Sequence, residues 1–169
     1  MKKNIVLVGM MGCGKTTVGE ELAKTLSEYN YVDIDIEIEK STQKKISEIF
    51  LKHGEPFFRM LETEKILKFS NLEKQIISTG GGAFESEENR KNLMSNGVII
   101  YLKTTPKTIF DRIKNETHRP LLRKDFSVEK IASIIKNREL NYKKADLIID
   151  TDNKTPQDIV KEIIGAINE

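Results

Sequence analysis

The sequence has little of three things that would each point to a particular class of protein. Its 169 residues include one cysteine, Cys13, so no internal disulfide can form and an oxidising compartment is not implied. The 28 basic residues are balanced by 26 acidic ones, which gives no general attraction to nucleic acid or to an anionic membrane. No stretch approaches the roughly 18 consecutive apolar residues needed to span a bilayer. We therefore expect a cytoplasmic protein with no nucleic-acid or membrane partner, and we predict a monomer.

The amino-terminal segment MKKNIVLVGMMG superficially resembles a signal peptide. Its apolar run stops at Gly9, however, and leads into a glycine-rich turn with no cleavage-like segment after it. A buried first strand is the better interpretation. The chain has the length of one ordinary domain and contains no internal repeat, low-complexity tract or domain-scale linker. We predict a single domain over residues 1–169.

Short apolar runs alternate with segments of helical periodicity along the chain. The strand-like runs cover residues 5–8, 31–34, 75–78, 98–102 and 147–149. The helical patterns cover residues 15–27, 46–72, 87–95, 106–114, 127–143 and 156–167, and HGEP divides the second of them into two helices. This alternation predicts an α/β fold, namely a three-layer α/β/α sandwich around a five-stranded parallel sheet.

The segment GMMGCGKT, residues 9–16, fits the phosphate-binding pattern G-x-x-x-x-G-K-[ST] and lies between the first strand and the first helix. In such a loop backbone N–H groups surround phosphate oxygens, the lysine reaches the β- and γ-phosphates, and the hydroxyl binds Mg²⁺. Cys13 is better explained as a small residue that fits a tight turn than as an activated thiol. We predict an ATP and Mg²⁺ site that includes Gly12, Cys13, Gly14, Lys15, Thr16 and Thr17.

A triphosphate site alone does not identify the reaction. A GTPase would be expected to carry a base-reading segment such as N-K-x-D after a later strand, and the sequence has none. The chain is also shorter than most cores of motor or transport ATPases. A small-molecule kinase is the class that remains.

Two acidic residues, Asp33 and Asp35, stand two apart at the end of the second strand. Extended backbone would place both carboxylates on one face, beyond the carboxyl end of the sheet where ligands of α/β proteins bind. One could then hold hydrated Mg²⁺ and the other an acceptor hydroxyl. An acidic first turn of a helix explains the same pair equally well.

The segment EIFLKHGEPFFRMLE, residues 48–62, adds a candidate anion-binding group. On a helix that begins near Pro56, Arg59 and Glu62 share a face, and an arginine oriented by a carboxylate suits capture of a ligand carboxylate. Phe50 and Phe58 could form an apolar wall for a ring. The alternative is a surface salt bridge beside core phenylalanines.

Residues 115–125, NETHRPLLRKD, form the one stretch without clear periodicity, which is typical of a functional lid. We predict a lid over about residues 114–125. Arg119 within it could bring positive charge to a transferring phosphoryl group. A solvated loop arginine is the alternative.

Taken together, these segments resemble the shikimate kinase family, within the nucleoside-monophosphate-kinase-like group of P-loop proteins. The matching pieces, in order over nearly the whole chain, are GMMGCGKT, D-I-D at 33–35, GEPFFRMLE at 54–62, STGGG at 78–82, RPLL at 119–122 and RELNYKKA at 138–145. The resemblance implies Mg·ATP-dependent phosphorylation of the 3-hydroxyl of shikimate, in chorismate and aromatic amino acid biosynthesis.

The resemblance also implies roles on the acceptor side, within a helical segment at about residues 33–62 and beyond it. Arg59 and Arg138 would grip the shikimate carboxylate beside Phe58. Asp35 would bind hydroxyls and orient or deprotonate the attacking one. Gly80, Gly81 and Gly82 would approach the substrate through backbone N–H groups, where a side chain would occupy its space and where glycine permits the required backbone conformations.

On the nucleotide side, the resemblance implies that Lys15 and Arg119 stabilise the transferred phosphoryl group and that Asp33 supports Mg²⁺ through water. Arg112 would stack against adenine, with the segment around Pro156 opposite. Two alternatives stay open: a related kinase for gluconate or a nucleoside monophosphate, and a noncatalytic ATP-binding regulatory module.

Overall fold

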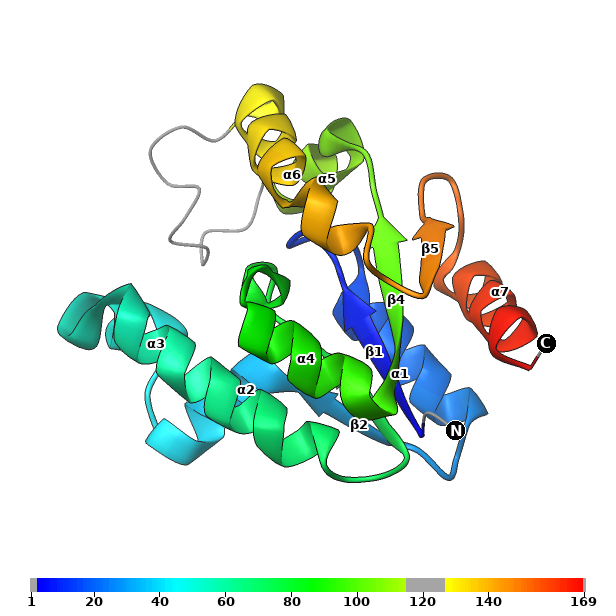
Figure 1. The fold of residues 1–169 in the computed structure, drawn as a ribbon. Coiled ribbons are helices and arrows are strands. Elements are labelled where there is room, and N and C mark those ends of the chain that lie inside the picture. Colours follow the sequence, from blue (N-terminus) through cyan, green and yellow to red (C-terminus); the bar gives the residue numbers. More distant parts are fainter. Residues whose placement is uncertain (1–2, 115–126, 169) are drawn as a thin grey trace.

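The computed structural model describes residues 3–114 and 127–168, which form a five-stranded parallel sheet with helices on both faces (Figure 1). The strands are β1 (Asn4–Val8), β2 (Asn30–Asp33), β3 (Gln75–Ser78), β4 (Gly97–Lys103) and β5 (Leu147–Asp150). Their spatial order is β2-β3-β1-β4-β5, and each neighbouring pair is parallel. The predicted α/β/α sandwich and its five strands are confirmed.

The helices match the predicted periodic segments with one exception. They are α1 (Lys15–Thr25), α2 (Ile34–Thr42), α3 (Ile46–Ser70), α4 (Glu87–Asn96), α5 (Pro106–Ile113), α6 (Val128–Tyr142) and α7 (Pro156–Ile167), with a short 3₁₀ turn η1 (Ala83–Glu85). Gly54 interrupts α3 with φ 80° and ψ 171°, which confirms the predicted break at HGEP. Among the described residues, no helix is both long and apolar enough to cross a membrane.

The exception is α2, which the sequence pattern did not separate from the end of β2. It begins at Ile34 because Asp33 caps it: Asp33 Oδ1 accepts hydrogen bonds from the backbone N–H groups of Asp35 at 2.9 Å and Ile36 at 3.2 Å. The expectation that Asp33 and Asp35 lie on one face of extended backbone is therefore wrong. Asp33 ends the strand, and Asp35 lies in the first turn of the helix, as the alternative interpretation had it.

The three central strands, β1, β3 and β4, are buried on both faces because a separate layer of helices covers each face of the sheet. Along β1, Val6 and Val8 pack against α3 and α4, whereas Ile5 and Leu7 pack against α1 and α7. Figure 1 shows α3 and α4 together on one side of the sheet and α7 on the other. Burial on both faces explains why the strands read as continuous apolar runs.

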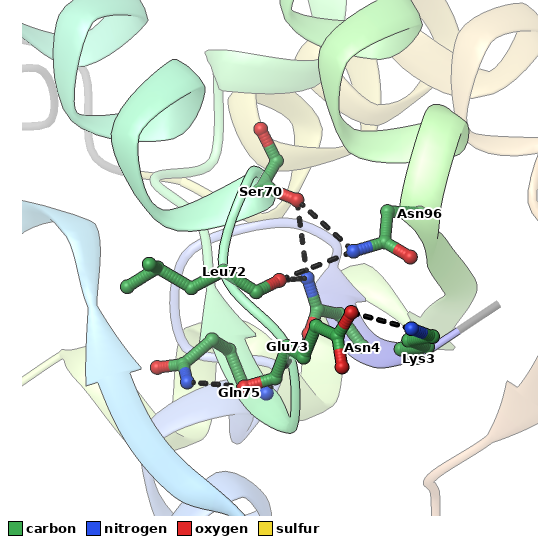
Figure 2. Close-up of polar contacts among 7 residues, drawn as sticks. All are labelled: Lys3, Asn4, Ser70, Leu72, Glu73, Gln75 and Asn96. Atoms are coloured by element: carbon green, nitrogen blue, oxygen red, sulfur yellow. Dashed lines mark hydrogen bonds and ion pairs between the residues drawn. The ribbon is translucent and has the colours of Figure 1, made fainter.

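The end of the sheet where the strands begin is fastened by side-chain amides (Figure 2). Asn4 Nδ2 donates to the carbonyl oxygens of Ser70 at 3.3 Å and Leu72 at 2.8 Å, and Asn4 Oδ1 accepts from the Gln75 N–H at 2.9 Å. Asn96 Nδ2 donates to the Leu72 carbonyl at 3.1 Å. Side-chain amides thus pair the carbonyls of Ser70 and Leu72 at this end of the sheet, whereas ligands of α/β proteins bind at the opposite end, where the strands finish.

Candidate active site

A cavity of about 900 Å³ lies at the carboxyl ends of β1, β2 and β3. Segments far apart in the sequence meet there, and most predicted site residues line it: Gly12, Gly14, Lys15, Thr16, Thr17, Asp33, Asp35, Phe58, Arg59, Gly80, Gly81, Gly82, Arg112 and Arg138. Within the described part of the chain, two predicted residues do not line it, Cys13 and Pro156. Arg119 and nearly all of the predicted lid lie outside the described residues.

The loop after β1 has the geometry of an anion cradle. Gly12 has φ 77° and Gly14 has φ 99°, a left-handed region that favours glycine, and a Cβ at Gly12 would come within 2.7 Å of Ile113 Cγ2. Gly14 caps α1, whose first turn contains no acidic residue and receives no side-chain cap. The positive end of α1 is therefore left for an anion such as phosphate.

The side chain of Lys15 folds back onto this loop. Its Nζ donates to the carbonyl oxygens of Gly9 at 2.8 Å and Met10 at 3.0 Å, and lies 3.7 Å from Cys13 Sγ. Cys13 itself is buried in the core cluster beneath α1, as a small residue fitting a tight turn would be. From α5, Arg112 Nη1 donates to the Gly12 carbonyl at 3.2 Å. Two cations thus border the cradle, which suits a polyphosphate.

Oxygen atoms from α1 and β2 come together beside the cradle. The Thr16 hydroxyl lies 3.5 Å from Asp33 Oδ2, and the Tyr31 hydroxyl lies 3.5 Å from the same oxygen. Because Asp33 Oδ1 caps α2, Oδ2 is the carboxylate oxygen directed toward Thr16. A hydroxyl and a carboxylate oxygen next to a phosphate cradle are the donor types that Mg²⁺ takes, so the residues present fit this ion.

Two carboxylates, Asp35 and Glu62, line one part of the cavity, together with Phe58, Arg59, Arg138 and the glycine triplet. We call this part the acceptor half of the cavity. Asp35 Oδ1 and Glu62 Oε2 are buried without a hydrogen-bond partner among the described residues. Both face the same space, since a Cβ at Gly80 would lie 3.2 Å from the first and 3.0 Å from the second. Burial raises the pKa of Asp35 to about 6, and the charges of Asp33 and Glu62 contribute to the increase. Burial raises the pKa of Glu62 as well, against the opposing effect of Arg59.

Arg59 is held from two sides. Its Nη1 donates to Glu62 Oε1 at 2.9 Å, while Nε and Nη2 donate to Glu55 Oε1 at 3.3 and 3.2 Å. Its guanidinium lies 5.2 Å from the ring centre of Phe58, which in turn lies 4.8 Å from that of Phe50. Arg59 and Glu62 share a face of α3 as predicted, but Glu62 is fully buried, so the pair is not the surface salt bridge of the alternative interpretation.

The glycine triplet is explained by close approach and not by backbone conformation. None of Gly80, Gly81 and Gly82 has a positive φ, so their backbone angles do not use the wider range of conformations that glycine was expected to permit there. A Cβ at Gly82 would lie 2.6 Å from Arg59 Nη2, and one at Gly81 would lie 3.2 Å from the Met11 backbone nitrogen. The cation and the phosphate-binding loop can come this near only because side chains are missing.

Sequence reasoning missed Tyr142 at the end of α6. Its hydroxyl donates to the Gly81 carbonyl at 2.5 Å, across 61 residues of sequence. The available signal was the spacing in RELNYKKA, which puts Tyr142 four residues after Arg138 and on the same helix face. Ser78, whose hydroxyl is buried without a partner among the described residues, was also missed, although it lines the cavity.

Comparisons with known proteins show the family of this chain. The shikimate kinase family model matches residues 11–168. The chain belongs to the shikimate kinase family. A shikimate kinase from Thermodesulfovibrio yellowstonii is 45% identical over 162 residues, covering 96% of this chain and 93% of the relative. One from Persephonella marina is 44% identical over 165 residues, covering 98% and 99%.

Solved structures of this family share the fold. A shikimate kinase from Acinetobacter baumannii, in complex with shikimate, superimposes with a TM-score of 0.93 at 35% identity, over 99% of this chain and 93% of that one. A shikimate kinase from Aquifex aeolicus gives a TM-score of 0.82 at 33% identity, over 98% and 96%. Membership of this kinase family makes the protein a phosphotransferase that uses ATP.

Proposed function

We propose that this protein transfers the γ-phosphoryl group of ATP to the 3-hydroxyl of shikimate, giving shikimate 3-phosphate and ADP. The observation that carries the proposal is one cavity in which Asp35, Arg59 and Arg138 lie beside a phosphate-binding loop. A protein that only binds a nucleotide would not need these three side chains beside the loop. The family match and the shikimate-bound Acinetobacter baumannii relative support the same acceptor.

The acceptor half of the cavity suits a small anionic polyol. Arg59 and Arg138 supply the positive charge that would bind the carboxylate, and Phe58 supplies an apolar wall for the ring. Within the described residues, none of the N–H groups of Gly80, Gly81 and Gly82 donates a hydrogen bond. These glycines are half-buried at the cavity wall, and we assign their amides to substrate oxygens, because a bound substrate would withdraw them from water and backbone donors withdrawn from water normally have partners.

Asp35 is placed to accept the proton of the attacking hydroxyl. In the transfer, the hydroxyl oxygen forms a bond to the γ-phosphorus, the bond from that phosphorus to the bridging oxygen breaks, and ADP leaves with the electron pair. With a pKa of about 6, Asp35 is ionised at neutral pH yet more basic than an ordinary aspartate. Lys15 would move from the Gly9 and Met10 carbonyls to the phosphates, where its charge opposes the developing negative charge.

Thr16 and Asp33 are the residues that would hold Mg²⁺, Asp33 through water. When bound, Mg²⁺ neutralises charge on the phosphate oxygens. The phosphate clamp by Arg119 and the adenine contacts of Arg112 and Pro156 stay predictions, as do the lid, the monomeric state and the cytoplasmic location.

The proposal is tested by measuring ADP release with shikimate, gluconate and nucleoside monophosphates as acceptors. Shikimate should stimulate release, and Arg59→Ala should raise its KM about 10- to 100-fold, since a hydrogen bond to a charged group is lost. Lys52→Ala is the matched control, because Lys52 is an exposed cation on the same helix outside the cavity. A higher rate of ADP release with another acceptor would make that acceptor the proposed substrate in place of shikimate. ATP binding without ADP release under any acceptor would indicate a regulatory module.

A further inference from the structure

The three carbonyl groups of the glycine triplet find their hydrogen-bond partners in different ways. The Gly80 carbonyl accepts from the Ala83 N–H at 3.1 Å, and the Gly82 carbonyl accepts from the Glu85 N–H at 3.2 Å, so both are paired within the turn. The Gly81 carbonyl accepts instead from the Tyr142 hydroxyl at 2.5 Å, on α6. One side chain from a distant helix therefore fixes the central peptide of the turn.

Tyr142 is itself rigidly placed. It is only 1% exposed, and its ring stacks on that of Tyr101 from β4, with centres 4.7 Å apart and planes 19° apart. Burial raises the pKa of the Tyr142 phenol far above the neutral range, although the nearby Arg138 guanidinium opposes this. The hydroxyl therefore keeps its proton and acts as a donor to Gly81.

Tyr142 also connects the glycine turn to Arg138, which with Arg59 is proposed to bind the substrate carboxylate. Arg138 lies four residues earlier on the same face of α6, and its Nη1 would be 3.3 Å from a Cβ at Gly81. Arg138 and the Gly81 peptide thus lie side by side at the cavity, and Arg138 Nη1 also lies 3.7 Å from Met10 Sδ. The bond from Tyr142 to the Gly81 carbonyl therefore sets where this peptide lies relative to the Arg138 guanidinium.

We propose that Tyr142 is a positioning residue for the acceptor, holding the Gly81 peptide and Arg138 in the arrangement that binds it. This inference rests on the proposed function, because it assigns those two groups to shikimate. Tyr142 does not line the cavity and acts only through its neighbours. Its effect should therefore be confined to the acceptor and leave the nucleotide half of the site unchanged.

Tyr142→Phe tests the proposal, because it removes one oxygen and keeps the stacked ring. Shikimate KM and its dissociation constant from calorimetry should both rise about 3- to 10-fold, the effect of one lost hydrogen bond. The KM for ATP should stay within about twofold of wild type, which also shows that the preparation is folded. Tyr101→Phe is the matched control: it removes the same atom from the neighbouring ring without touching the bond to Gly81.

A lower melting temperature with unchanged shikimate KM and affinity would show that Tyr142 is merely structural and would overturn the inference. Equal losses for shikimate and ATP would do the same, since the effect would not be confined to the acceptor. Failure of the proposed function looks different, because wild-type protein would then show no ADP release with shikimate.

Discussion

Replacing Asp35 with asparagine should make the protein more stable and nearly inactive. Asp35 is buried beside two other carboxylates, and one of its oxygens has no partner among the described residues, so its ionised form is held at a cost in folding free energy. An asparagine side chain would be close in size and uncharged. The same substitution removes the proposed base, whose loss typically lowers kcat about 100- to 10,000-fold.

The pKa sets the size and the sign of the stability change. The folded-state pKa of about 6 compared with the ordinary 3.8 corresponds to roughly 3 kcal/mol, at about 1.4 kcal/mol for each pH unit. Below about pH 3 the carboxyl is protonated in both states, so its burial costs nothing. As pH rises from about 3 to 7 the unfolded chain ionises first and the folded state becomes less stable, and above about pH 7 the full difference applies.

Urea unfolding of wild type and Asp35→Asn at pH 4, 5, 6 and 8 measures this directly. The variant should gain up to about 3 kcal/mol at pH 8, or roughly 6 to 12 °C in melting temperature for a chain of this size, and only about 0.5 kcal/mol at pH 4. Asp152→Asn is the opposite control: although burial opposes the change, hydrogen bonds from Thr108 and Thr105 lower the pKa of Asp152, so this variant should gain no stability.

A destabilised Asp35→Asn variant at pH 8, or a gain of equal size at pH 4 and pH 8, would refute the argument that ionised Asp35 is held against its environment. Wild-type kcat/KM should also fall below about pH 6 as Asp35 takes up its proton. Retained kcat in the variant would refute its assignment as the base.

Two further substitutions test the glycine triplet and the phosphate-binding lysine. Gly82→Ala places a Cβ 2.6 Å from Arg59 Nη2, so it should raise the KM for shikimate several-fold and leave the KM for ATP unchanged. Gly165→Ala is the control, because no atom lies within 4 Å of its Cβ, and it should leave both KM values unchanged. Equal KM values for wild type and Gly82→Ala would mean that Arg59 moves freely. Lys15→Met should lower kcat about 100-fold or more while the melting temperature changes little, and undiminished turnover would end the proposed role of Lys15.

The architecture could be predicted from the sequence because its signals are local. Apolar runs marked the five strands, and HGEP marked the break in α3, since Gly54 takes a φ of 80° that favours glycine. The phosphate-binding loop was equally readable, because its chemistry lies in eight consecutive residues between a strand and a helix. In each case neighbours along the chain determine the structure.

The contacts inside the site could not be predicted in this way. That Glu62 is fully buried, or that Tyr142 reaches a carbonyl 61 residues away, depends on how α3 and α6 pack against the sheet. The start of α2 was missed because Asp33 fits both the end of a strand and the cap of a helix. For the glycine triplet, the sequence suggested space for a substrate together with backbone freedom, but it could not show which groups approach: Glu62 and Asp35 at Gly80, Arg138 at Gly81 and Arg59 at Gly82.

The proposed base and the phosphate-binding lysine are coupled, and this affects how Lys15→Met is interpreted. The charge of Lys15 lowers the pKa of Asp35, against burial and two neighbouring carboxylates that raise it. Removing Lys15 therefore takes a cation from the phosphates and also leaves more of Asp35 protonated at neutral pH. The two effects separate with pH, because the second disappears once Asp35 is fully ionised. Part of the loss of kcat in Lys15→Met should thus be recovered at pH 8 to 9, and a loss of the same size at pH 7 and pH 9 would show that the two groups act independently.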